Sequence, residues 1–184
     1  MKKATSFLGL FLLFLLAIPS NEKVSAVSEY EVKAAYLVNF GKFVTWPDKT
    51  FSDETDPFVI GVLGDDPFGD LMEKATVGKT CNGRPYMIKR FDHFESEKAG
   101  ALKKCQILFI SYSEKDSVNN ILQALKNSNV MTVAEFHSFL IIGGMIAFDQ
   151  VGDKINFILS PRAVEKAELK VSSKLMQIAK LYEK

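Results

Sequence analysis

Residues 58–70 read FVIGVLGDDPFGD, and this stretch decides the fold. Its first part, residues 58–63, is a nearly all-apolar run, which is typical of a strand buried on both faces of a parallel sheet. Asp66-Pro67 follows as a helix cap with a first-turn proline, so the pattern predicts a helix over residues 67–75. A buried strand that leads through a polar turn into a helix is the repeating unit of α/β proteins.

The rest of the chain repeats this alternation of strands and helices. Hydrophobic periodicity predicts further strands at 85–91, 106–110 and 130–133, and helices at 95–104, 116–126 and 135–140. The pattern then changes to two extended runs, at 145–149 and 154–159, which are predicted to form an antiparallel hairpin. Two helices follow, one that begins after Ser160-Pro161 and one at 172–182. We therefore expect an α/β, Rossmann-like fold: a single domain over residues 27–184 with a mostly parallel sheet flanked by helices and a C-terminal antiparallel hairpin.

A helix precedes the first strand. It begins at Ser28, where Glu31 three residues later completes a capping box, and it is expected to end at Trp46 before Pro47.

The first 26 residues have the layout of a secretory signal peptide. Lys2 and Lys3 form a positive start, residues 7–18 carry no charge, and residues 24–26 place small or β-branched side chains before a cleavage point after Ala26. An uncleaved membrane anchor is the alternative, but the apolar run is too short to cross roughly 30 Å of hydrocarbon. We therefore expect the protein to be exported.

The charge balance and the absence of several sequence motifs argue against several functional classes. Removal of residues 1–26 takes away three lysines and one glutamate, which shifts the net charge from +1 to −1. Such a chain lacks the basic surface of a nucleic-acid-binding protein. The sequence contains no dinucleotide fingerprint, P-loop or nucleophile elbow. His93 and His137 stand at no ligand spacing from a cysteine, so we expect no metal site. Because these motifs are missing, we also expect no cofactor and no enzyme; an envelope hydrolase using either histidine is the alternative.

Aromatic residues crowd the end of the first predicted helix. At 100° per residue, Trp46 lies about 120° from Phe40, so one helix face does not bury Phe40, Phe43 and Trp46 together. We predict that part of this helix end is an exposed surface that binds a partner protein. A helix packed between the sheet and its neighbours is the alternative interpretation.

Polar residues follow two of the predicted strands. Asp65 and Asp66 come after the first strand, and Ser111 and Ser113 come after the third. The carboxyl ends of parallel strands meet at one edge of the sheet, where ligands commonly bind. A small-ligand pocket at these residues is therefore a second hypothesis. The alternative is structural, because Asp66 can cap the helix and Asp65 can complement its positive end.

The sequence contains two cysteines, Cys81 and Cys105. In an oxidising compartment an even count allows one disulfide, so we treat this pair as a candidate bridge. Two separate buried thiols are the alternative, because spacing alone does not show whether the sulfur atoms meet.

Several segments of the chain, taken in order, resemble the YfiR/HmsC-like periplasmic proteins. Residues 32–47 read VKAAYLVNFGKFVTWP, close to the family's opening, approximately VKAAFLYNFAKFVEWP. The other matching segments are GDDPFG at 64–69, GKT at 78–80 with GRP at 83–85, GGMI at 143–146 and LKVSSKL at 169–175.

The resemblance implies an α/β domain in the periplasm of a Gram-negative bacterium. The best-understood members restrain a membrane-bound diguanylate cyclase by binding its periplasmic part, which holds down cyclic-di-GMP and biofilm formation. An outer-membrane or peptidoglycan-associated lipoprotein can sequester such regulators, and other relatives occur beside sensor kinases. We therefore expect a periplasmic repressor whose partner contacts are Phe40, Phe43 and Trp46, with Arg84 as a charged edge. A small-ligand sensor acting with a sensor kinase is the alternative, and a second copy of the chain is a further candidate partner.

The cysteines depart from the family pattern. Many relatives carry a cysteine in the first strand that pairs with one at the start of the third, where Cys105 stands. The first strand here has Gly61 instead, so Cys81 would have to substitute from the start of the second strand. In a 2-1-3 strand order those strand ends lie about two 4.8 Å spacings apart, which exceeds the usual reach of a disulfide unless the preceding loop folds over.

Overall fold

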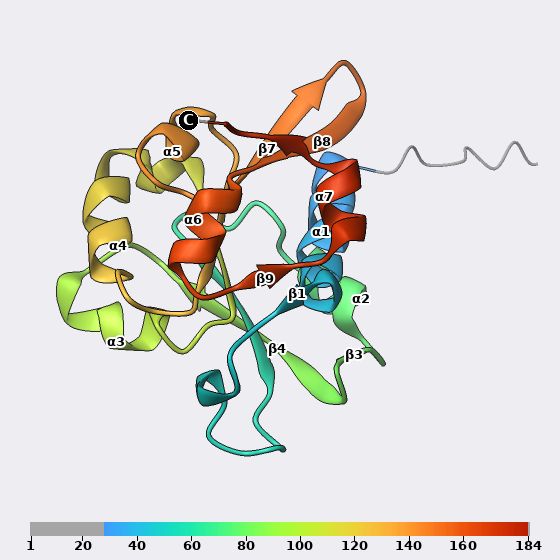
Figure 1. The fold of residues 1–184 in the computed structure, drawn as a ribbon, viewed down its shortest axis with the longest axis vertical. Helices are drawn as coiled ribbons and strands as arrows, with labels where there is room; N and C mark the ends of the chain where they lie inside the picture. The colour runs from blue at the N-terminus through green and yellow to red at the C-terminus, as the bar shows by residue number, and fades with distance from the viewer. Residues whose placement is uncertain (1–27, 184) are drawn as a thin grey trace, which may run out of the picture.

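The computed structural model describes residues 28–183, which form helices packed on both faces of a mostly parallel sheet (Figure 1). The strands are β1 (Val44–Thr45), β2 (Phe58–Leu63), β3 (Thr80–Cys81), β4 (Arg84–Phe91), β5 (Ile107–Ile110), β6 (Met131–Ala134), β7 (Ile146–Val151), β8 (Lys154–Leu159), β9 (Lys170–Val171) and β10 (Lys180–Leu181). The α-helices are α1 (Glu29–Phe43), α2 (Leu71–Thr76), α3 (Ala99–Leu102), α4 (Val118–Ala124), α5 (Ser138–Ile141), α6 (Pro161–Lys166) and α7 (Ser173–Ile178). Short 3₁₀ turns are η1 (Asp48–Thr50), η2 (Ser96–Lys98) and η3 (Tyr112–Ser117).

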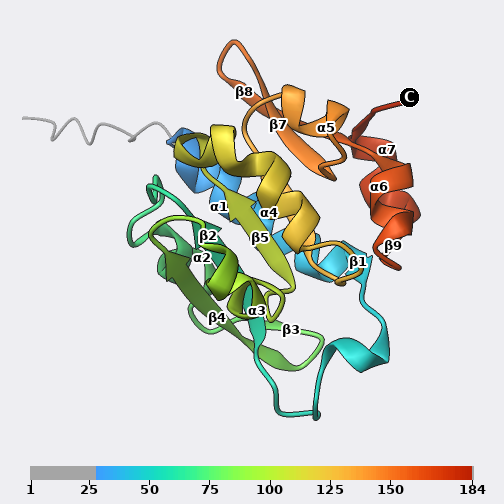
Figure 2. The ribbon, with the colours of Figure 1, turned by 90° about the vertical axis from the view of Figure 1, so that its left-hand side faces the viewer.

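The strand order confirms the predicted α/β architecture. Within residues 28–183, eight strands form the main sheet in the order β10-β8-β7-β6-β5-β2-β4-β3. The strands β4, β2, β5, β6 and β7 pair in parallel, so the first three large strands follow the 2-1-3 order. The antiparallel pair β7 and β8 is the predicted C-terminal hairpin. Four short strands were not predicted. β3 and β10 extend the main sheet, and β1 pairs with β9 beside it. Figure 2 shows β1 and β9 close together.

Apolar clusters cover the two faces of the main sheet. The side chains of β2 alternate between them: Ile60 packs in the cluster that contains α1, α2, α6 and α7, while Val59 packs in the cluster that contains α3, α4 and α5. Figure 1 shows this layering, with α3 and α4 to the left of the sheet and α1 and α2 to the right. A strand buried on both faces has no polar face, which is why residues 58–63 are almost all apolar.

The helix α1 begins as predicted but ends earlier. The Ser28 hydroxyl accepts a hydrogen bond from the backbone N–H of Glu31, and the Glu31 carboxylate accepts one from the N–H of Ser28. The expected end at Trp46 is wrong, because α1 stops at Phe43 and the next two residues pair with β9. That pairing joins segments far apart in the sequence, so local patterns did not reveal it.

The helix α2 begins at Leu71, four residues later than the cap pattern predicted. Gly69 adopts φ +52°, a left-handed conformation that interrupts a helix. The Asp66 carboxylate accepts a hydrogen bond from the Phe68 backbone N–H at 2.8 Å, so Asp66 caps the turn that precedes the helix.

Candidate functional site

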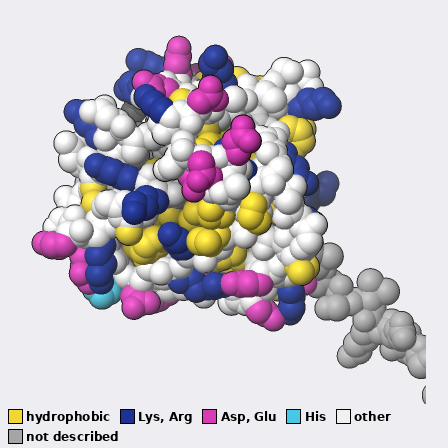
Figure 3. All heavy atoms as spheres, turned by 90° about the horizontal axis from the view of Figure 1, so that it is seen from below, with side chains coloured by type: hydrophobic (Ala, Val, Ile, Leu, Met, Phe, Trp, Pro, Cys, Tyr) yellow, Lys and Arg dark blue, Asp and Glu magenta, His cyan; other side chains and the backbone are white. Residues whose placement is uncertain are grey.

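A cavity of about 290 Å³ lies at the amino edge of the main sheet, where β2 and β4 begin. Trp46, Phe51, Phe58 and Arg84 form much of its wall. Figure 3 views this side of the molecule from below and shows hydrophobic side chains gathered near its centre, with lysine and arginine side chains among them. The structure thus brings together two of the predicted partner contacts, Trp46 and Arg84, although they are far apart in the sequence.

One residue of this amino-edge cavity, Trp46, carries a hydrogen-bond donor that has no acceptor. Trp46 is only 7% exposed, and its ring packs edge-on against Phe58 with the centroids 5.0 Å apart. In the described part of the chain, Trp46 Nε1 and Thr50 Oγ1 are the buried side-chain polar atoms without a hydrogen-bond partner. A buried donor that lacks an acceptor costs about 1–3 kcal/mol, so an oxygen atom presented by a ligand or partner would relieve that cost.

Arg84 adds positive charge to the same cavity. Its Nη1 donates hydrogen bonds to the backbone carbonyls of Asp53 and Asp56 at 2.7 and 2.9 Å. Its guanidinium also lies 3.9 Å from the centroid of the Phe51 ring. These contacts hold the guanidinium in place, and a fixed charge beside a buried N–H favours an acceptor oxygen.

The prediction that the side chains of Phe40 and Trp46 are exposed is wrong. Phe40 is fully buried, in contact with the rings of Phe148 and Phe157. Trp46 is buried as well, because it lies beyond the end of α1 and packs against Phe58. Phe43 is half-buried against the same cluster. The alternative interpretation therefore holds for Phe40: α1 packs between the sheet and other helices.

The four predicted ligand-binding residues do meet at the carboxyl edge of the main sheet, but several of their polar groups bond within the chain. The Ser113 hydroxyl accepts a hydrogen bond from the Asp65 backbone N–H at 2.9 Å. The Asp66 carboxylate pairs with Arg90 at 2.6 Å in addition to its turn contact. Ser111 is buried, with its N–H bonded to the backbone of β2. Their contacts favour the structural interpretation of these residues over a ligand pocket.

Sequence reasoning missed a charged cluster at this carboxyl edge. Lys33 is 4% exposed, and its ammonium group pairs with Glu29 and, at 2.7 Å, with Glu135. Tyr30 lies beneath it, with the ammonium 4.5 Å from the ring centroid. Burial lowers the pKa of Lys33, but hydrogen bonds to Glu135 and Glu29 outweigh it, so the pKa rises above its ordinary 10.5. A cavity of about 270 Å³ adjoins the cluster. The lysine at the fifth position of α1, one turn after Glu29, was the available signal, but its partner Glu135 lies in a distant segment.

The candidate disulfide between Cys81 and Cys105 is absent, because both thiols are free and lie on opposite faces of the main sheet. Cys81 Sγ donates to the Gly41 carbonyl at 3.1 Å. Cys105 faces Gly61, where an added Cβ would lie 2.8 Å from its sulfur. A side chain at position 61 would therefore meet Cys105.

We expect neither thiol to react quickly in the folded protein. Burial raises the pKa of Cys81, and burial raises that of Cys105 to about 12, so little thiolate forms near neutral pH. Iodoacetamide followed by intact-mass measurement should show no added group on the native protein within minutes and two groups after denaturation without a reductant. Only a protein that needs a reductant before the second group is added would support the bridge.

Residues 28–183 contain no group of three or more histidine, cysteine, aspartate or glutamate side chains arranged to hold a metal ion. No helix in that part of the chain is long and apolar enough to cross a membrane. The signal peptide expected over residues 1–26 lies outside the described residues.

The fold defines an α/β protein with helices on both faces of a mostly parallel sheet and a C-terminal hairpin. The chain belongs to the YfiR/HmsC-like family of periplasmic regulators, because that family's model matches residues 30–180. A solved structure, described as a conserved domain protein from Vibrio cholerae O1 biovar El Tor strain N16961, shares the fold with a TM-score of 0.58 and 10% sequence identity. The similarity covers 85% of this chain and 60% of that one, so this chain matches only part of the solved protein. No curated protein matches the sequence.

Proposed function

We propose that this protein binds the periplasmic part of an inner-membrane diguanylate cyclase and restrains it, which lowers cyclic-di-GMP and biofilm formation. The observation that carries this proposal is the family match over residues 30–180. The protein acts by binding and catalyses no reaction. An outer-membrane or peptidoglycan-associated lipoprotein relieves the restraint by competing for it.

Restraint of this kind requires a difference in affinity. A regulator shifts its partner toward the inactive state only by the ratio of its affinities for the inactive and active states. Moving a partner from 99% active to 99% inactive takes about a 10⁴-fold ratio. Several contacts must therefore form in one state and not in the other.

The amino-edge cavity is the docking point that the geometry supports best. It offers the unpartnered N–H of Trp46 and the charge of Arg84 beside aromatic rings. A partner that inserts a carbonyl or carboxylate oxygen there would satisfy the indole donor. Its volume of about 290 Å³ suits one inserted side chain better than a large ligand.

The first test is a measurement of cyclic-di-GMP in the host cell with the gene deleted and then restored. We expect the level to rise on deletion and to fall again when the exported protein is restored, but not when a form without residues 1–26 is restored. An unchanged level, with expression of the gene verified, would refute control of a cyclase and favour a sensor kinase as the partner.

The substitution Trp46→Phe tests the docking point. Phenylalanine retains the aromatic packing on Phe58 but lacks the N–H, so we expect partner binding to weaken about tenfold through loss of one buried hydrogen bond. Binding to the partner's purified periplasmic domain is measured by titration calorimetry. Tyr112→Phe, at the opposite edge of the sheet, is the control that should bind normally. Unchanged binding of Trp46→Phe with an unchanged melting temperature would rule out the indole as a contact.

A further inference from the structure

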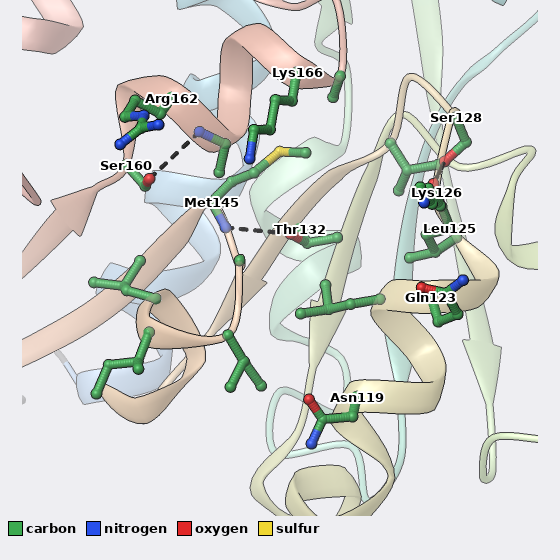
Figure 4. Close-up of a pocket in the computed structure, with 18 of the residues that line it drawn as sticks. Asn119, Gln123, Leu125, Lys126, Ser128, Thr132, Met145, Ser160, Arg162 and Lys166 are labelled. Atoms are coloured by element: carbon green, nitrogen blue, oxygen red, sulfur yellow. Dashed lines mark hydrogen bonds between the residues drawn. The ribbon is translucent and has the colours of Figure 1, made fainter. Parts of the chain in front are cut away.

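A second cleft lies beside the first residues of β6 and β7, apart from the cavity at the start of β2 and β4. Its volume is about 770 Å³, within the usual range of small-molecule sites. Figure 4 shows Arg162 and Lys166 of α6 on one side and Asn119 and Gln123 of α4 on the other, with Met145 between them.

The cleft opens because β6 and β7 pair over only part of their length. Backbone pairing joins Val133 to Ile146 and Ala134 to Ala147. One step earlier, the N–H of Met145 donates instead to the Thr132 hydroxyl at 3.3 Å, and the strands separate. The turn that carries Met145 away requires glycine: Gly143 has φ +104°, and a Cβ on Gly144 would overlap the ring of Phe139. The GGMI segment of the sequence therefore shapes this cleft.

Three cations line the cleft, and two of them, Lys126 and Lys166, have no carboxylate partner among residues 28–183. Lys126, Arg162 and Lys166 line it, and its lining residues include no aspartate or glutamate. Among residues 28–183, no carboxylate lies within ion-pair distance of Lys126 or Lys166. A concave surface lined by charges of one sign concentrates ligands of the opposite sign.

Apolar side chains share the rest of the lining with uncharged polar ones. Val130 and Met145 are buried at the inner wall. Ile141 is 62% exposed and Ile142 is 38% exposed at the rim, and both side chains also line the cleft. Two adjacent exposed isoleucines beside a cavity offer apolar surface that a ligand can cover.

We propose that this cleft binds a small organic anion with an apolar body. The acidic group lies between Lys126 and Lys166, and the apolar body covers Met145 and the two isoleucines. A fully apolar ligand would leave the ammonium groups without a counter-charge, and an inorganic anion would leave the apolar wall uncovered. This site is distinct from the amino-edge cavity, so it stands whether or not that cavity binds a partner.

A matched pair of fluorescent probes tests both parts of the proposal. The anion 8-anilinonaphthalene-1-sulfonate and its uncharged analogue N-phenyl-1-naphthylamine share one aromatic body and differ by the sulfonate. We expect saturable one-to-one binding of the anion to the folded protein, weaker binding of the uncharged analogue, and a loss of anion affinity as salt is raised.

Variants locate the probe. The double variant Lys126→Gln/Lys166→Gln should weaken binding of the anion about fivefold, from two partly exposed charge contacts, and leave the uncharged analogue unaffected. The variant Ile141→Gln/Ile142→Gln should weaken both probes. Lys103→Gln/Lys174→Gln, which removes two exposed lysines elsewhere, is the control and should change neither. Circular dichroism and melting temperature verify that each variant is folded.

Two results would overturn the proposal. The first is anion binding by folded Lys126→Gln/Lys166→Gln that equals wild type, which would place the probe elsewhere. The second is equal affinity for the two probes, which would show that the cleft does not recognise charge.

Discussion

Replacing Lys33 with methionine is expected to lower the free energy of unfolding by about 3 kcal/mol. The substitution keeps a long unbranched side chain but removes the ammonium group, and this leaves Glu135 without its cation in a site where the carboxylate side chain is only 15% exposed. Loss of one partner from a buried ion pair typically costs about 3–5 kcal/mol, and the partial exposure of Glu29 favours the lower figure. Urea unfolding followed by circular dichroism measures the change.

Two variants separate charge from packing in this cluster. Lys42→Met, at an exposed position on the same helix, should change stability by less than about 0.5 kcal/mol. Adding Glu135→Gln to Lys33→Met removes the unpaired charge and should restore more than 1 kcal/mol, or about a third of the loss. If Lys33→Met is no more destabilising than Lys42→Met, the cluster does not contribute to stability.

The cluster should also lose its effect at alkaline pH. The pKa of Lys33 is raised in the folded state, so its charged form stabilises the fold fully below the ordinary pKa of 10.5. As the pH rises through the folded-state pKa, the proton is lost and the stabilisation disappears. The stability difference between wild type and Lys33→Met should therefore be constant from pH 7 to about pH 9 and shrink above 10.5.

Local sequence patterns predicted the elements whose determinants are local. The strand at 58–63 was predicted at its exact bounds because every side chain in it is buried, and the Ser28–Glu31 capping box formed as expected. One error occurred where distant segments meet: Val44-Thr45 leaves the helix because β9 pairs with it. Another was local, because a left-handed Gly69 delays α2 and the cap pattern at Asp66-Pro67 did not show this.

The candidate sites likewise combine residues that the sequence predicted with contacts between distant segments that it did not predict. Trp46 and Arg84 were predicted as contacts and do line one cavity, but the structure, and not the spacing, shows that the indole N–H lacks a partner. Lys33 and Glu135 come together only because α1 begins at the carboxyl edge, where β6 ends. The anion cleft arises from the separation of β6 and β7, which depends on sheet register and is not visible in composition.

The side chain of Phe40 should contribute more to stability than any other aromatic contact predicted from sequence. It is 0% exposed and touches the rings of Phe148 and Phe157, with the closer centroid 5.1 Å away. Phe40→Ala should lower the free energy of unfolding by about 4 kcal/mol, since truncation of a buried phenylalanine removes apolar burial and leaves a cavity. The half-buried Phe43, truncated in the same way, should lose less than half as much, and both changes follow from urea unfolding curves with unchanged slopes. The folded fraction of Phe40→Ala should still bind the partner at the amino-edge cavity. If Phe40→Ala instead keeps wild-type stability but loses binding, Phe40 is a partner-contact residue.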